Sequence, residues 1–176
     1  MVFDDELKFN EHIALKVKKA NQAVGMIRNT FTYLDKGIFL VLYKSFVRPH
    51  LEYSSVVWSP IYKKDILAIE NVQRRATKML PELRDMSYEN RLRTPGLPTL
   101  YYRRDRADML QLFKIMAGFE SVNIDNIKLA TSTNRGHKFK LHKSFAGTRF
   151  GQHRFSNRIV NTWNSLSSTT VQADSV

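Results

Sequence analysis

The chain has 176 residues, of which 43% are hydrophobic and 11% aromatic, enough to bury the core of one globular domain or of a compact domain with a smaller appendage. It contains no cysteine, which excludes disulfides, thiolate zinc sites and cysteine nucleophiles. The N-terminal stretch MVFDDELKFN is acidic, unlike a secretory signal, and no apolar run reaches the roughly 18 residues of a membrane span. These features permit an intracellular origin, and we expect no membrane partner.

The charge is strongly positive and unevenly distributed. Lys and Arg number 28 against 16 Asp and Glu, which gives a formal net charge of +12. Residues 1–125 hold 20 basic and 15 acidic side chains, whereas residues 126–176 hold 8 basic and 1 acidic. A basic tract without compensating acids attracts polyanions over about a Debye length, so the composition favours nucleic acid over a membrane surface as the partner.

The N-terminal part predicts helices that pack as a bundle. From Ile13 to Leu34 apolar residues recur at steps of three and four, which places them on one stripe of a long helix. Asp35 is suited to cap a second helix over 36–48, which is apolar nearly all round and is expected to be buried on most sides. A third helix, over 49–58, has a proline in its first turn.

Three further helices are predicted before residue 120. The first begins at Asp65, carries an apolar face at helical spacing and ends before Pro81. A short helix covers 87–93. Thr99 is the expected N-cap of a long helix that ends near Gly118.

Beyond about residue 120 the helical periodicity is lost. The stretch STNRGHKFKLHK alternates basic with apolar side chains, as is typical of a strand, and GTRFGQHRF is its candidate partner in a β-hairpin. Ser156 is the expected cap of a last helix. The predicted fold is therefore mainly α, with a helical bundle over 1–120 and a small basic C-terminal unit over 121–176.

The sequence shows no self-sufficient catalytic constellation. The acidic cluster Asp4, Asp5 and Glu6 could bind Mg²⁺, but an acidic lead-in that favours the N-terminus of the next helix is the preferred interpretation. The histidines lack partners at zinc spacings, and those of the basic tract are interpreted as phosphate contacts or plain surface. No glycine-rich phosphate loop or nucleophile elbow occurs. We expect no metal or cofactor in this chain.

Cations interleaved with aromatic residues are the candidate nucleic-acid contacts. Lys and Arg reach phosphates, while aromatic rings stack on unpaired bases. Phe139, in the predicted strand, either stacks on a base or is buried by the strand alternation. The phosphate contacts predicted around it are Arg135, Lys138, Lys140 and Lys143.

Further candidate cations lie on three predicted helices. Arg74 follows Glu70 by four residues, the order that favours an ion pair within a helix, so it is assigned to that pair. Trp58 and Trp163 are assigned to the core because aliphatic residues surround them at helical spacing. The remaining candidates are Arg75 and Lys78, Lys16, Lys18 and Lys19, and, beside Tyr101 and Tyr102, Arg103, Arg104 and Arg106.

Seven segments, taken in order, resemble one protein family. They closely resemble the C-terminal region of non-LTR retrotransposon reverse transcriptases of the LINE type, the jockey-like group in particular. The resemblance covers nearly the whole chain. The segments are FDDELKFNEHI, KANQAVGMIRNTF, LYKSFVRPHLEYSSVVWSP, DILAIENVQRRATKML, YENRLRTPGLPTLYYRRDRADMLQLFKIMAG, RGHKFKL and FSNRIVNTWNSL.

The resemblance implies a thumb-like bundle over 1–120 and a basic C-terminal extension that together hold template and primer, or the element's RNA. RNA and RNA/DNA hybrid are the implied ligands, the fingers and palm of the same polyprotein the implied partner, and nucleus and cytoplasm the implied location. The catalytic aspartates and their Mg²⁺ belong to the palm, which precedes this region. The chain alone is thus expected to be inactive in RNA-directed DNA synthesis.

The resemblance also implies a further helix after VQADSV, which would cover apolar surface around Trp163. The first-helix lysines would lie along the groove of the duplex. The alternative function is a structural or protein-interaction module that docks on the polymerase core and has no direct nucleic-acid role.

Overall fold

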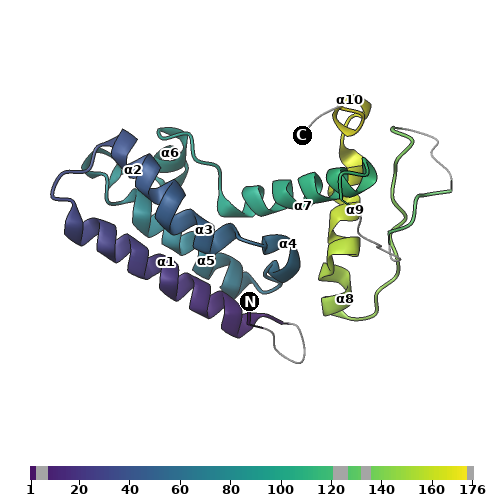
Figure 1. Cartoon of the computed structure of the whole chain (residues 1–176), viewed down its shortest axis with the longest axis horizontal. Helices are drawn as coiled ribbons and strands as arrows, with labels where there is room; N and C mark the ends of the chain where they lie inside the picture. The colour runs from purple at the N-terminus through teal and green to yellow at the C-terminus, as the bar shows by residue number, and fades with distance from the viewer. Residues whose placement is uncertain (3–7, 121–126, 132–135, 174–176) are drawn as a thin grey trace. The chain divides into compact units, whose positions relative to one another are not determined.

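The computed structural model describes residues 1–2, 8–120, 127–131 and 136–173. These residues are mainly helical, as the sequence predicts (Figure 1). They divide into two compact units, Met1–Arg104 and Asp105–Val176, so that the division falls inside the long helix α7 (Leu100–Met116). The sequence places this division later, at residue 120.

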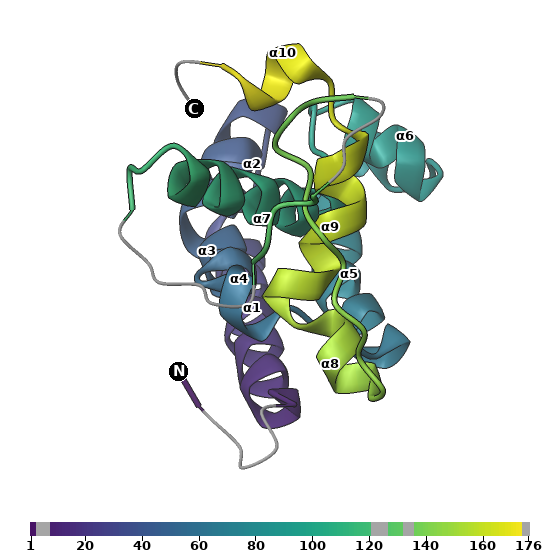
Figure 2. The same cartoon turned by 90° about the vertical axis from the view of Figure 1, so that its right-hand side faces the viewer.

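The N-terminal unit is built on two long helices that pack side by side, α1 (Asn10–Thr30) and α5 (Lys63–Thr77) (Figures 1 and 2). Short elements surround them. These are α2 (Lys36–Leu42), the π-helical turn η1 (Tyr43–Val47), α3 (Arg48–Glu52), α4 (Ser55–Trp58), the 3₁₀ turn η2 (Pro81–Leu83), α6 (Tyr88–Arg93) and the first residues of α7. Apolar side chains from all of these elements, including Phe39 of α2, form one core.

Three helix starts carry side-chain caps, and the sequence predicts two of them, Asp35 and Thr99. The Asp35 carboxylate accepts a hydrogen bond from the backbone N–H of Ile38 at 2.9 Å. Thr99 Oγ1 accepts from the N–H of Tyr102 at 3.1 Å, and Ser87 caps α6 in the same way. Each cap satisfies a donor that the first turn of a helix leaves without a partner.

The helix predicted over 36–48 is less buried than expected. Its chain runs on through the π-helical turn Tyr43–Val47 into α3, so the wider turn precedes Pro49, whose ring and missing N–H disturb a regular helix. One face is buried, through Phe39, Tyr43 and Val47. The opposite face exposes Val41 at 64% and Phe46 at 58%, so the prediction of burial on most sides is wrong.

The helix predicted over 49–58 is divided into α3 and α4. The break lies at Ser54, whose φ of 55° is left-handed. The indole N–H of Trp58 donates to the carbonyl of Tyr53 at 2.8 Å, while its ring is fully buried. Burial of this ring against the core thus favours the break over a continuous helix, and the assignment of Trp58 to the core is confirmed.

A buried polar network joins α5 to three other parts of the N-terminal unit. Gln73 accepts a hydrogen bond from the Tyr43 hydroxyl at 2.5 Å and donates to the Pro98 carbonyl and the Tyr88 hydroxyl, both at 3.1 Å. The Glu70 carboxylate accepts from the Tyr88 hydroxyl and from the Leu100 N–H. Burial, followed by the hydrogen bond to Glu70, raises the pKa of Tyr88, which keeps this hydroxyl a donor.

The C-terminal unit packs the end of α7 against α8 (Arg149–His153), α9 (Phe155–Ser165) and α10 (Ser168–Val171). Its core contains Leu112, Leu141, Ile159, Val160, Trp163 and Val171. Trp163 is only 2% exposed, so its place in the core is confirmed and residues of this chain already cover it. Helix α9 begins at Phe155, which places Ser156 inside the first turn and not at the predicted cap.

The predicted hairpin has a different partner. Residues 149–153 form α8, because Thr148 caps a helical turn there by accepting from the Gly151 N–H at 3.1 Å. The extended segment instead forms a single antiparallel bridge between Leu141 and Leu129, with hydrogen bonds of 2.8 Å on either side. Within the described residues this bridge is the only β-pairing, so the pairing with 147–155 is wrong.

Helix α9 holds the other edge of the extended segment. The amide of Asn164 accepts from the Leu141 N–H at 2.8 Å and donates to the Leu141 carbonyl at 2.9 Å, as a neighbouring strand would. The Trp163 indole donates to the Phe139 carbonyl at 2.8 Å. Side chains of a helix therefore replace the second strand of a hairpin.

Replacing Tyr88 by Phe is expected to destabilise the N-terminal unit by about 1–3 kcal/mol, because Glu70 and Gln73 each lose a buried hydrogen-bond partner. Urea unfolding followed by circular dichroism measures the change. The control is Tyr101→Phe, which removes the same hydroxyl from an exposed ring of α7. Equal stability of the two variants would contradict a structural role for the network.

Replacing Asn164 by Ala is expected to release the extended segment, since both backbone groups of Leu141 lose their partner. Amide hydrogen exchange should show faster exchange at Leu141, by at least about tenfold for a loss of roughly 1.4 kcal/mol. Asn161→Ala, on the exposed side of the same helix, is the matched control, because Asn161 accepts from the Lys143 ammonium at 3.3 Å but bonds neither backbone group of Leu141. Unchanged protection at Leu141 would contradict the assignment.

Candidate nucleic-acid interface

The three lysines of α1 lie on two different faces. Lys16 and Lys19 lie close enough to His50 of α3 that their charges, after partial burial, lower the pKa of that imidazole. Lys18 instead lines a hollow between α1 and α5. The difference follows from the helix period, since residues three apart share a face and residues two apart do not.

The predicted cations of α5, Arg75 and Lys78, line a hollow of about 590 Å³ at the end of the α1–α5 pair. Arg75 donates to Asn21 Oδ1 of α1 at 2.7 Å, which fixes its guanidinium at the edge of the hollow. Two cations that the sequence prediction missed, Arg28 and Arg84, line the same space. We call this space the basic hollow.

No acidic side chain lines the basic hollow. The side chains of Arg28, Lys78 and Arg84 form no hydrogen bond or ion pair with any residue in the described part of the chain. Four like charges that share a concave surface reinforce one another's potential, which attracts anions. The sequence carries no local signal for Arg28 or Arg84, because their place beside Arg75 follows from the packing of distant elements.

The floor and the rim of the basic hollow are apolar and aromatic. Val24 of α1 and Met79, just after α5, contribute to its lining together with Leu34. Phe31 and Tyr33, in the loop between α1 and α2, also line it, and Tyr33 is 79% exposed. The hollow thus combines positive charge with a flat, accessible ring.

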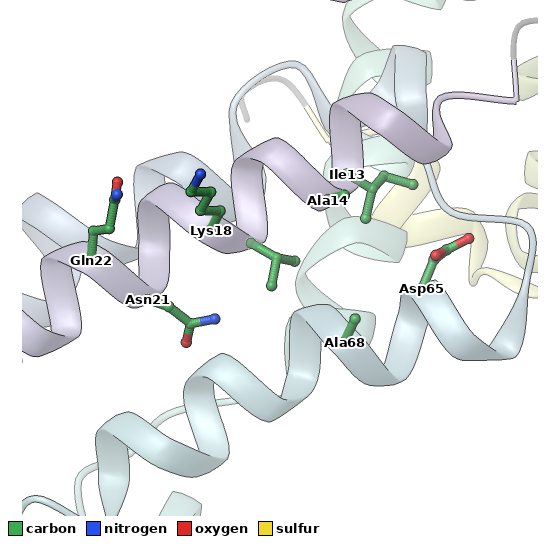
Figure 3. A pocket seen from close by; sticks show the side chains of 8 residues that line it. Ile13, Ala14, Lys18, Asn21, Gln22, Asp65 and Ala68 are labelled. Carbon is green, nitrogen blue, oxygen red and sulfur yellow. The ribbon is translucent and has the colours of Figure 1, made fainter.

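A second hollow, of about 640 Å³, adjoins the first along the same two helices and shares Asn21 with it (Figure 3). Figure 3 shows Asn21 directed from α1 towards α5, and Asp65 and Ala68 on α5. Lys18 is the one cation of this lining and Asp65 the one acid. Their charges offset each other, so the positive potential is concentrated in the basic hollow.

The aromatic and arginine cluster of α7 is mostly committed to the fold. Arg103 forms a bidentate ion pair with Glu52, through Nε to Oε1 and through Nη2 to Oε2 at 2.8 Å, which raises the pKa of the guanidinium. Arg104 is only 4% exposed. Arg103 is held by Glu52 and Arg104 is buried, so neither position agrees with the prediction of a surface contact with phosphate. Arg106, Tyr101 and Tyr102 remain exposed.

Arg74 does not pair with Glu70 as predicted. The Glu70 carboxylate is buried and accepts hydrogen bonds from Tyr88 and Leu100. The Arg74 guanidinium instead lies 4.0 Å from the centre of the Tyr88 ring, in a cation–π contact. Glu70 and Arg74 do lie one helical turn apart, as predicted. The Glu70 carboxylate nevertheless points into the core, where it accepts these hydrogen bonds.

The extended segment of the C-terminal unit presents its cations outward. Lys138 and Lys143 are exposed and Lys140 is half-buried, while Leu141 and Phe139 belong to the core cluster. Phe139 is half-buried and packs against this core cluster, which favours the packing interpretation of this residue. Arg135, the remaining predicted contact of this group, lies outside the described residues.

Gly136 precedes these lysines and is needed there. Its φ is 90°, a conformation that residues with a side chain rarely adopt. A Cβ at this position would lie 2.8 Å from Lys140 Cε. The absence of a side chain therefore lets the Lys140 stem lie across the turn.

His137 packs inside the C-terminal unit. It is buried, with Nε2 3.1 Å from the Trp163 carbonyl and its ring edge-on to that indole. Among the described residues, no three His, Asp or Glu side chains could hold one metal ion. The predicted acidic cluster at residues 4–6 lies outside that part of the chain.

Comparison with protein-family models, with curated proteins and with solved structures finds no match for this chain. The resemblance to reverse transcriptases stays a prediction. In the part of the chain that the structure covers, no helix combines the length and apolar character that crossing a bilayer requires.

Replacing Lys16 and Lys19 by Gln is expected to raise the pKa of His50 towards its ordinary value, because two nearby positive charges disappear and the charged imidazole becomes less unfavourable. An NMR titration of the His50 ring measures this. Lys18→Gln is the control and should leave His50 unchanged, since only Lys16 and Lys19 are charges that lower the pKa of His50 and Lys18 lines a separate hollow. An equal shift in the control would contradict the placement of the lysines.

Proposed function

We propose that this chain is the nucleic-acid-binding C-terminal part of a non-LTR retrotransposon reverse transcriptase, thumb and basic extension, which holds template and primer or the element's RNA. The ordered resemblance of its segments supports the family. The catalytic aspartates and Mg²⁺ would be supplied by the upstream palm, so the chain binds but does not polymerise by itself. Its proposed location is nucleus and cytoplasm.

One observation carries the binding role: no acid lines the basic hollow or stands among the cations of the segment 138–143, and three acids elsewhere are held by the fold. Glu52 and Asp108 are engaged by Arg103 and Arg158, the latter through two hydrogen bonds of 2.8 Å, and Glu70 belongs to the buried network. The basic hollow and the segment 138–143 keep their charge. Rigid elements thus present positive charge where phosphates can reach it.

A second candidate is the protein-interaction module. The exposed apolar face of α2 and η1, with Val41 and Phe46, supports it, since an apolar face rimmed by polar residues often marks a protein contact. In this alternative the fingers and palm of the same polyprotein would cover that face, and the positive charge would be incidental.

Binding of an RNA/DNA hybrid is expected to weaken steeply as salt rises, because phosphate contacts release counterions. The variant Lys138→Glu, Lys140→Glu, Lys143→Glu should lower the slope of log affinity against log salt by about three. Filter binding of the whole chain over a salt series measures the slope.

The matched control reverses Lys36, Lys44 and Lys63, which changes the net charge equally at exposed positions of the N-terminal unit. It should retain most of the slope. Absence of hybrid binding at low salt would overturn the proposal. Intact binding after reversal of residues 138, 140 and 143 would favour the protein-interaction module.

A further inference from the structure

We propose that the basic hollow of the N-terminal unit is a binding site for one unstacked nucleotide of a single-stranded nucleic acid. The four cations would hold the phosphates on either side of it, and the base would stack on Tyr33. This inference rests on the proposed function and names a ligand for a place where the sequence prediction found only Arg75 and Lys78.

The charge of the hollow fits a polyanion and not a single neutral ligand. Arg28 comes from α1, Arg75 and Lys78 come from the end of α5 and Arg84 follows η2, so three separate elements converge on one space. Arg75 uses one N–H on Asn21 and keeps its other donors. Glu82 and Asp85 flank Arg84 in sequence, yet neither lines the hollow.

The apolar part of the hollow fits a base. Met79, Val24 and Leu34 provide a floor without hydrogen-bonding groups, and the Tyr33 ring stands largely exposed beside them. Stacking on an aromatic ring is tolerant of sequence, because every base has a π-face. A volume of about 590 Å³ lies within the roughly 300–1,000 Å³ of ordinary ligand sites.

Gly25 keeps the hollow open. It lines the space from the middle of α1, and a Cβ built on it would meet no atom within 4 Å. Glycine costs an interior helical position roughly 0.5–1 kcal/mol relative to alanine, so the residue is not favoured by helix stability. A larger side chain here would enter the hollow without changing its charge.

A bound single-stranded nucleic acid would have room to continue beyond the basic hollow. The adjoining hollow of Lys18 and Asp65 continues along the same helices from Asn21, and its charges nearly cancel. A neighbouring nucleotide would therefore find space there but little added attraction. Binding is expected to be strongest for a strand with phosphates on both sides of the stacked base, and weaker for a free mononucleotide.

Gly25→Phe tests the site without altering charge. Fluorescence anisotropy with a labelled single-stranded RNA of about 12 nucleotides should show affinity lowered by about tenfold, as expected when one stacked base is lost. Gly25→Ala, which leaves the hollow open, should bind as the wild type does. Tyr33→Ala should lose a similar factor, and Tyr33→Phe should retain affinity.

Arg28→Gln and Arg84→Gln should each lower the salt slope for the single strand by about one. If Gly25→Phe and Tyr33→Ala bind the single strand as tightly as the wild type, the nucleotide site is wrong, even where hybrid binding through Lys138, Lys140 and Lys143 persists. If these variants weaken binding of the single strand as expected but the wild-type chain does not bind the hybrid, the nucleotide site is supported and the proposed function is contradicted. Tighter binding of UMP alone than of the strand would also overturn the site.

Discussion

The N-terminal unit depends on one buried carboxylate. Glu70 lies inside the bundle and accepts hydrogen bonds from Tyr88 of α6 and from the first residue of α7. One turn along α5, Gln73 binds Tyr43 of η1 and the Pro98 carbonyl. Buried polar groups are costly unless every partner is present, so this network permits one rotation of α5 about its axis. That rotation decides which side of α5 meets α1 and which cations lie at the surface.

The same constraint explains why the charges at the surface differ from those that local sequence spacing suggests. Glu70 is the local partner expected for Arg74, yet it turns inward, and Arg74 lies over the Tyr88 ring instead. Arg103, by contrast, pairs with Glu52 and is not available as a surface contact. Charged residues that are close in sequence, such as Glu70 and Arg74, thus end up in different places, one in the core and one at the surface. The cations left over gather where the fold places no acid, around the end of the α1–α5 pair.

In the C-terminal unit a helix performs the role of a strand. Asn164 pairs with both backbone groups of Leu141, and the Trp163 indole binds the Phe139 carbonyl. The extended segment is therefore satisfied on both edges, by this helix and by the bridge to Leu129. Its alternation then points lysines outward and Phe139 inward. An extended basic segment held in this way can meet a polyanion with little further ordering, because its backbone is already fixed.

Local signals in the sequence determined the helical class, most helix positions, the caps at Asp35 and Thr99, the burial of Trp58 and Trp163, and the outward lysines of the alternating segment. These features depend on neighbours three or four residues away, or two in a strand. Only the tertiary structure decided the break at Ser54, the exposed face of α2, the partner of Leu141 and the burial of Arg104. It also brought Arg28 and Arg84 beside Arg75, 47 and 9 residues apart in the chain. Periodicity shows which side of a helix is apolar, but which distant side chains meet there follows from packing.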